Sequence, residues 1–305
     1  MADLLKQLQD EVNTVIKGKE DVVEKVLCAM LAGGHILLRD IPGVGKTTLA
    51  MMIAKVMDLS CRRVQFTPDV LPSDIVGFSM YNSQKKEFEY REGAVMTNLF
   101  LADEINRTSP KTQSALLEAM EEEKVTVDGI EHALPSPFTV IATENPYGSS
   151  GTQMLPESQL DRFMVCLEMG YPEHEDAVEI LKNNGAAGLC KARKVLTAKE
   201  WEEYRKRAET CFVSDDMYDY LVRLTEATRK NPYVSLGASP RASIALLRMS
   251  RAMAVMRGRD YVVPEDVQAL YQDVFGHRVR PGISAKAEGI EITEILGRIF
   301  HEVKV

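Results

Sequence analysis

The feature that most constrains the fold is a short apolar run that breaks into a Gly-rich turn and continues as a helix. Residues 35–38 form the apolar run, Gly43 and Gly45 lie in the turn, and a helical pattern extends to Met57. In this strand–loop–helix order, backbone N–H groups and a helix N-terminus bind the phosphates of a nucleoside triphosphate. An ordinary Gly-rich turn is the alternative, but the strand before it and the helix after it favour a phosphate loop.

The loop itself suggests which residues bind the phosphates and a magnesium ion. We expect Lys46 to reach the β- and γ-phosphates and the Thr47 hydroxyl to bind Mg²⁺. The phosphate-binding residues are predicted to be Pro42, Gly43, Val44, Gly45, Lys46, Thr47 and Thr48. Asp40 occupies the position where the usual pattern begins with glycine, and Asp tolerates turn geometry better than most residues.

A second apolar run, residues 98–102, ends in two adjacent acids, Asp103 and Glu104. This pattern is typical of a buried parallel strand that delivers carboxylates at its carboxyl end. We expect Asp103 to bind Mg²⁺ through water and Glu104 to act as the general base that deprotonates the attacking water. Acids commonly mark strand exits, so the prediction depends on the phosphate loop upstream.

Two further apolar runs end or begin at polar residues of interest. Residues 138–143 precede Asn145, which we expect to hydrogen-bond the attacking water or the γ-phosphate; the alternative is a turn former before proline. Arg162 lies just before the run 164–167. It is either a solvated charge or, in a ring of subunits, a cation that reaches a neighbour's γ-phosphate.

Together these segments resemble the AAA+ ATPases and, within them, the MoxR family. The resemblance covers nearly the whole chain. Its most specific parts are the stretches 110–120, 142–146 and 155–163, and it also includes 15–20, 34–48, 101–107 and 239–242.

The resemblance implies a three-layer αβα core with ATP and Mg²⁺ as cofactors, and a C-terminal helical lid. It implies that Ile16 and Gly18 lie on the adenine side and that Asn145 is the first sensor. Arg162 corresponds to an arginine finger that acts in trans. Arg241 corresponds to a second sensor that reaches the γ-phosphate of its own subunit. Arg107 is either a second trans-acting cation or the partner of an acid, and the pairing is slightly favoured.

A trans-acting arginine implies a ring, and we expect a hexamer. The resemblance also implies a chaperone-like machine for client proteins that often carry a von Willebrand factor A domain. The alternative is a nucleic-acid motor or loader, which the formal net charge of −8 disfavours because such proteins need a basic face. A scaffold that binds ATP without hydrolysing it is a third possibility, but Glu104 and Asn145 are both present.

The pattern of the chain changes near Tyr171 from alternating strands and helices to helices alone. We therefore predict a nucleotide-binding domain over residues 1–171 and a helical lid over 172–305. Its principal helices are predicted over 201–208, 215–228, 240–256 and 264–273. Ser239 and Pro240 are typical of a helix start, and Arg241 in the first turn opposes the helix dipole, which favours a functional role.

Composition adds three expectations. Five cysteines without a Cys-x-x-Cys pair are expected to be reduced packing residues, and the five histidines show no spacing typical of metal ligands. The first residues read as a charged amphipathic helix and no apolar run approaches a membrane-spanning length, so we expect a cytoplasmic protein.

Two insertions are predicted to be hairpins. Residues 71–94 alternate aromatic and charged side chains, and 124–134 contain Asp128-Gly129, a strong two-residue turn signal. In similar ATPases such elements project toward the pore, where they couple the nucleotide state to pulling on a substrate. Ordinary surface hairpins are the alternative.

Overall fold

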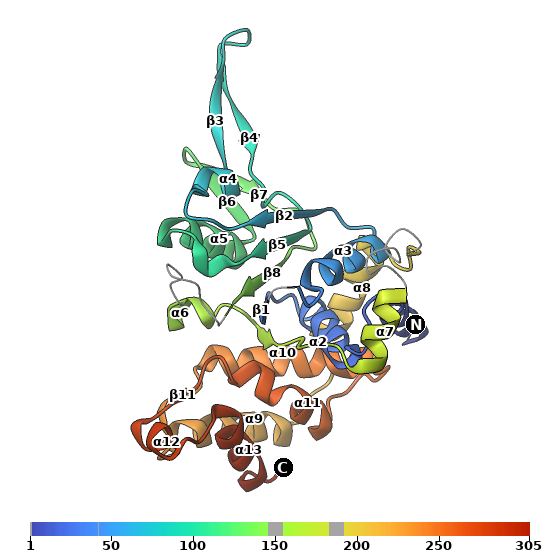
Figure 1. Cartoon of the computed structure of the whole chain (residues 1–305), viewed down its shortest axis with the longest axis vertical. Coiled ribbons are helices and arrows are strands. Elements are labelled where there is room, and N and C mark those ends of the chain that lie inside the picture. The colour runs from blue at the N-terminus through green and yellow to red at the C-terminus, as the bar shows by residue number, and fades with distance from the viewer. Residues whose placement is uncertain (1, 42, 146–154, 183–191) are drawn as a thin grey trace.

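A five-stranded parallel sheet forms the centre of the computed structural model, which describes residues 2–41, 43–145, 155–182 and 192–305 (Figure 1). In spatial order the strands are β2 (Cys61–Gln65), β5 (Leu99–Asp103), β8 (Thr139–Glu144), β1 (Ile36–Arg39) and β9 (Val165–Leu167). The four predicted strands are confirmed. Strand β2 was not predicted, because Arg62 and Arg63 interrupt its apolar pattern.

Side-chain alternation along the strands divides the core into two layers. In β1, Ile36 and Leu38 face one apolar cluster, whereas Leu37 faces the other. The first cluster includes α1 (Ala2–Asn13), α2 (Glu20–Leu31) and α3 (Lys46–Val56), and the second includes α5 (Pro110–Glu122). The sheet is therefore covered on both faces, which confirms the predicted three-layer αβα class.

The chain beyond β9 is mainly helical, as predicted. Its elements are α7 (His174–Lys182), α8 (Ala198–Glu209), α9 (Asp215–Lys230), β10 (Val234–Leu236), α10 (Pro240–Met256), α11 (Pro264–Phe275), β11 (Arg280–Pro281), α12 (Ile283–Glu288) and α13 (Ile292–Glu302). Ser239 caps α10 as expected, since its hydroxyl accepts a hydrogen bond from the backbone N–H of Ala242 at 3.2 Å.

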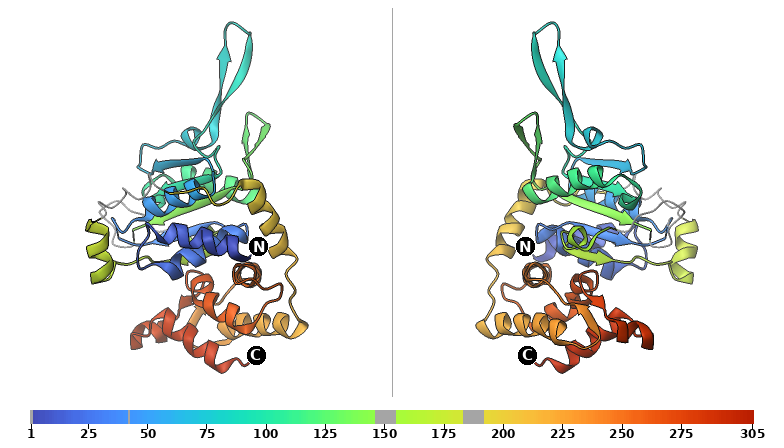
Figure 2. Two further views of the ribbon diagram at one scale, coloured as in Figure 1. Left: turned by 90° about the vertical axis from the view of Figure 1, so that its right-hand side faces the viewer. Right: turned by 90° about the vertical axis from the view of Figure 1, so that its left-hand side faces the viewer.

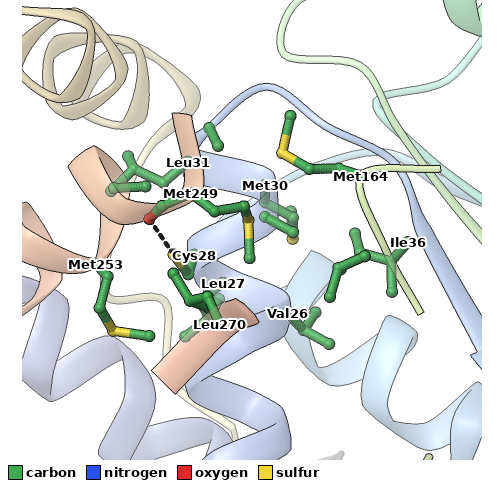
Figure 3. Close-up of a cluster of buried hydrophobic side chains, with 14 of the residues drawn as sticks. Val26, Leu27, Cys28, Met30, Leu31, Ile36, Met164, Met249, Met253 and Leu270 are labelled. Carbon is green, nitrogen blue, oxygen red and sulfur yellow. Dashed lines mark hydrogen bonds between the residues drawn. The ribbon is translucent and has the colours of Figure 1, made fainter. Parts of the chain in front are cut away.

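The C-terminal helices share a hydrophobic core with the first helices of the chain. Figure 3 shows α2 packed against α10, where the buried Cys28 thiol donates to the backbone oxygen of Met249 at 3.2 Å. The same cluster extends from Leu5 to Ile299 without interruption by the predicted boundary. The division at residues 171 and 172 stays a prediction.

Both predicted hairpins are present, and they project on the same side of the molecule (Figures 1 and 2). The longer hairpin, β3 (Gly77–Asn82) and β4 (Glu87–Glu92), follows the short helix α4 (Pro72–Val76). The shorter hairpin is β6 (Lys124–Val127) and β7 (Ile130–Ala133), and its turn places Asp128 and Gly129 at positive φ. The rings of Tyr90 and His132 stack at 3.8 Å between the two hairpins.

Among the described residues, no helix combines the length and the apolar character that a membrane crossing requires.

Candidate active site

The carboxyl ends of β1, β5 and β8 converge on a pocket of about 370 Å³. The parallel register brings these ends to one edge of the sheet, where ligands of α/β proteins usually bind. The pocket brings together the predicted residues Gly43, Gly45, Lys46, Thr47, Thr48, Asp103, Glu104 and Asn145. Residues that are far apart in the sequence therefore form one site.

The phosphate loop has the backbone that its glycines predict. Gly43 and Gly45 have φ values of 87° and 98°, a region that residues with a Cβ rarely adopt. The Lys46 ammonium donates to the backbone oxygens of Asp40 and Ile41, both at 2.9 Å, and so lies folded across the loop. Burial lowers the pKa of Lys46, and the carboxylates of Asp40, Asp103 and Glu104 oppose this effect.

Asp40 anchors the phosphate loop to the end of a neighbouring strand. One carboxylate oxygen accepts the backbone N–H groups of Met169 and Gly170, both at 2.7 Å, and the other accepts that of Ile41 at 2.8 Å. A glycine at this position could not make these bonds. The departure from the usual pattern therefore adds a link between the loop and the segment after β9.

Asp103 is buried at the end of β5 and has two side-chain partners. Its carboxylate accepts from Arg63 Nε at 2.6 Å and from the Thr143 hydroxyl at 3.2 Å. The Thr143 oxygen in turn accepts the backbone N–H of Glu104 at 2.9 Å. Thr143 thereby links the end of β8 to both acids.

Glu104 has a φ of 55°, an uncommon conformation for a residue other than glycine. Its carboxylate accepts from Arg107 Nη1 at 2.8 Å, across the short helix η1 (Ile105–Arg107). Arg107 therefore pairs with an acid in this structure, which agrees with the favoured interpretation.

Three residues of this pocket were not predicted from the sequence. Arg63 and Gln65 come from β2, which was not recognised as a strand, and both line the pocket. Thr143 reads as one more residue of an apolar strand. The signal that could have found it is its position directly before Glu144-Asn145 at the strand end.

Arg162 and Arg241 lie elsewhere. They line a second pocket of about 220 Å³ together with His35, which directly precedes β1, whereas the phosphate loop directly follows β1. The four residues of β1 span about 13 Å. The two arginines are therefore at the amino end of the sheet, opposite the phosphate pocket.

The expectation that Arg241 reaches the γ-phosphate of its own subunit is wrong for this structure. Helix α10 packs along α2 and α8, and this packing directs its N-terminus to the amino end of the sheet. Arg241 Nη2 pairs there with Glu121 Oε1 at 2.7 Å. Glu121 also pairs with Arg162, so the structure brings the two predicted arginines together.

The residues predicted to lie on the adenine side, Ile16 and Gly18, are outside the phosphate pocket. Ile16 is buried in the core, and Gly18, with a φ of 65°, lies against Asp176 of α7. Lys17 pairs with Glu179 of the same helix at 3.0 Å. Val44 is partly buried against the main core, and Pro42 lies outside the described residues.

Comparisons with known proteins agree with this geometry. The family described as "ATPase family associated with various cellular activities (AAA)" matches residues 35–165, and the family described as "AAA lid domain" matches residues 226–299.

Relatives align over nearly the whole chain. The chain is 46% identical over 303 residues to Uncharacterized protein YeaC of Bacillus subtilis (strain 168). That alignment covers 99% of this chain and 95% of the relative. The chain is 39% identical over 302 residues to Chaperone MoxR1 of Mycobacterium tuberculosis, which covers 96% of this chain and 80% of that protein.

A solved structure from Cytophaga hutchinsonii ATCC 33406 superposes with a TM-score of 0.92 at 37% identity, over 99% of this chain and 95% of that one. The phosphate loop, the paired acids and the helical C-terminal region thus occur in a chain whose relatives match it along nearly its full length. The chain belongs to the MoxR family of AAA+ ATPases.

Proposed function

We propose that this ATPase works as a ring, the expected hexamer, that remodels client proteins in the manner of a chaperone. The observation that carries the proposal is the separation of the phosphate pocket from Arg162 and Arg241, at opposite ends of the sheet. One subunit in this arrangement cannot bring both groups to the same phosphate, whereas two adjacent subunits can. The similarity to a protein named Chaperone MoxR1 supports the client role.

Within one subunit, the pocket supplies the groups that ATP hydrolysis requires. The loop N–H groups and Lys46 bind the phosphates, Glu104 takes a proton from the attacking water, and Asn145 orients that water. Arg162 of an adjacent subunit would stabilise the charge that develops on the γ-phosphate, and Arg241 beside it would do the same.

The Thr47 hydroxyl and the Asp103 carboxylate fit a magnesium ion, since both offer oxygen and both line the phosphate pocket. When bound, Mg²⁺ neutralises charge on the β- and γ-phosphates.

The two hairpins are proposed to contact the client. Exposed apolar side chains run along the longer hairpin, namely Phe78, Met80, Tyr81 and Phe88. Phe88 is 73% exposed, and its ring meets that of Tyr81 edge to face at 5.4 Å. We propose a client with a von Willebrand factor A domain, as implied by the resemblance to MoxR proteins.

A capture experiment tests the proposal. Glu104→Gln is expected to bind ATP without hydrolysing it and to retain its client from a cell lysate. Lys46→Ala, which loses a phosphate contact, serves as the control and should retain none. Mass spectrometry identifies the retained proteins, and equal recovery on both variants would contradict a nucleotide-dependent client cycle. Turnover stimulated by DNA at moderate salt would instead support a nucleic-acid motor.

A further inference from the structure

One carboxylate joins the two arginines of the second pocket. Glu121 Oε2 pairs with Arg162 Nη1 at 3.0 Å, and Glu121 Oε1 pairs with Arg241 Nη2 at 2.7 Å. The three residues come from three elements: α5, the turn after α6 (Glu157–Leu160), and the first turn of α10. The carboxylate of Glu121 thus joins α5 to the turn after α6 and to the first turn of α10.

The arginines differ in how else they are held. Arg162 Nη1 also donates to the backbone oxygen of Leu117 at 2.9 Å, one helical turn before Glu121, so α5 fixes this guanidinium twice. Arg241 is half exposed and sits at a helix N-terminus, where the helix dipole opposes a cation. Glu121 therefore offsets both the dipole and the repulsion between the two cations.

A second carboxylate of this pocket, that of Asp161, pairs with a different arginine. Asp161 accepts from the buried Arg278 at 2.7 Å and from the Ser239 hydroxyl at 3.1 Å. Arg248, two turns along α10 from Arg241, lines the same pocket and has no ion pair within the described part of the chain. Glu121 thus pairs with Arg162 and Arg241 and not with Arg248.

We propose that Glu121 is a positioning residue for ATP hydrolysis in trans, which holds Arg162 and Arg241 side by side as one cationic unit. This inference rests on the proposed function, because the unit would act on the nucleotide of an adjacent subunit. Each guanidinium carries five N–H donors, and an ion pair through one terminal nitrogen leaves others for a phosphate. Pre-positioning reduces the side-chain freedom that each arginine would otherwise lose in the transition state.

The experiment compares ATP turnover by Glu121→Gln with that of Glu122→Gln. Both variants remove one charge at the exposed end of α5, but Glu122 makes no ion pair among the described residues. We expect Glu121→Gln to lower kcat about 10- to 100-fold, with little change in KM for ATP. Glu122→Gln should match the wild type. Glu121→Asp keeps the charge but is one methylene shorter, so its kcat should be intermediate.

A mutant cycle separates positioning from general structural damage. If Glu121 acts through the two arginines, Glu121→Gln should lower kcat no further in the Arg162→Ala/Arg241→Ala background. A further loss in that background would overturn the proposal. So would wild-type kcat in Glu121→Gln, or in Glu121→Asp if the Gln variant does not fold. Wild-type turnover in Arg162→Ala would instead count against the proposed trans mechanism, so the two failures are distinguishable.

Discussion

Arg107 Nη1 donates to Glu104 Oε2 at 2.8 Å. The carboxylate that we propose deprotonates water therefore already has an ion-pair partner, which lies three residues further along the chain. A carboxylate oxygen that is occupied by a guanidinium is less available to accept a proton from water. The side chain of Glu104 is three-quarters buried and that of Arg107 is 44% exposed, so the arginine is the partner with room to move.

Arg107→Ala is therefore expected to raise basal ATP turnover, by up to about five-fold, since a partly exposed ion pair contributes at most about 1 kcal/mol. Steady-state phosphate release measures this directly. Glu104→Gln provides the reference, because it should bind ATP and lose nearly all turnover. A fall in turnover in Arg107→Ala would assign Arg107 to the trans-acting cations instead.

Arg63 pairs with Asp103 at 2.6 Å, and Asp103 is the carboxylate proposed to bind magnesium. Arg63→Ala should lower the half-saturating Mg²⁺ concentration for turnover, because the ion would no longer compete with a guanidinium for Asp103. Arg62→Ala is the matched control, since Arg62 bonds to the backbone oxygen of Gly93 instead. An unchanged Mg²⁺ dependence in Arg63→Ala would show that the pair does not oppose the metal.

The loss of Arg162 or of Arg241 should be complemented by subunits that lack the general base but keep both arginines. Arg162→Ala should leave ATP affinity nearly unchanged and remove most turnover, since arginine fingers contribute about 10³- to 10⁵-fold. Mixing it with Glu104→Gln subunits should recover activity, because some interfaces then pair a native Glu104 with a native Arg162. Arg241→Ala should be rescued in the same way. Absence of recovery in rings shown to be mixed would count against action in trans.

His35 should make folding stability depend on pH. Its Nδ1 accepts the backbone N–H of Val140 at 3.0 Å, so its Nε2 carries the proton and donates to the Met120 oxygen at 2.9 Å. Burial, together with the smaller effect of the charges of Arg248 and Arg205, lowers the pKa of His35 to about 4. The unfolded chain, with a histidine pKa near 6.5, therefore binds more protons between pH 6.5 and 4.

The contribution of His35 to the free energy of unfolding is thus fully present above pH 6.5. It decreases as the pH falls toward 4, by at most about 3 kcal/mol. Burial also lowers the pKa of His277, with the same sign. Urea unfolding at a series of pH values should give a smaller acid-side loss for His35→Gln than for the wild type. Identical pH profiles would contradict this account.

The predicted residues that lie together in the phosphate pocket share one property, which is that local sequence determines their position. Lys46, Asp103 and Asn145 each follow an apolar strand, and parallel strands bring their carboxyl ends to one edge. Arg241 was predicted equally well as a helix-start residue. The ion-pair partner of Arg241 was not predicted. Its identity depends on which face of α2 the helix α10 packs against, and no local sequence pattern determines that long-range packing.

Arg63 and Glu121 were missed for a related reason. Arg63 lies in β2 at the edge of the sheet, where a charged residue in alternation reads as a solvated surface position. Glu121 is one of three consecutive glutamates, 121–123, which look equivalent in the sequence. Only the approach of two arginines from distant elements distinguishes it.

The continuous core beneath the sheet also limits how the C-terminal helices can move. A cap joined by a linker could swing open on a hinge, but here α10 interdigitates with α2 around Cys28 and Met249 (Figure 3). Opening that seam would expose buried apolar surface, whereas sliding by a fraction of a helical turn would not. The packing thus favours shear, with small displacements between packed helices, over a hinged opening of the C-terminal helices.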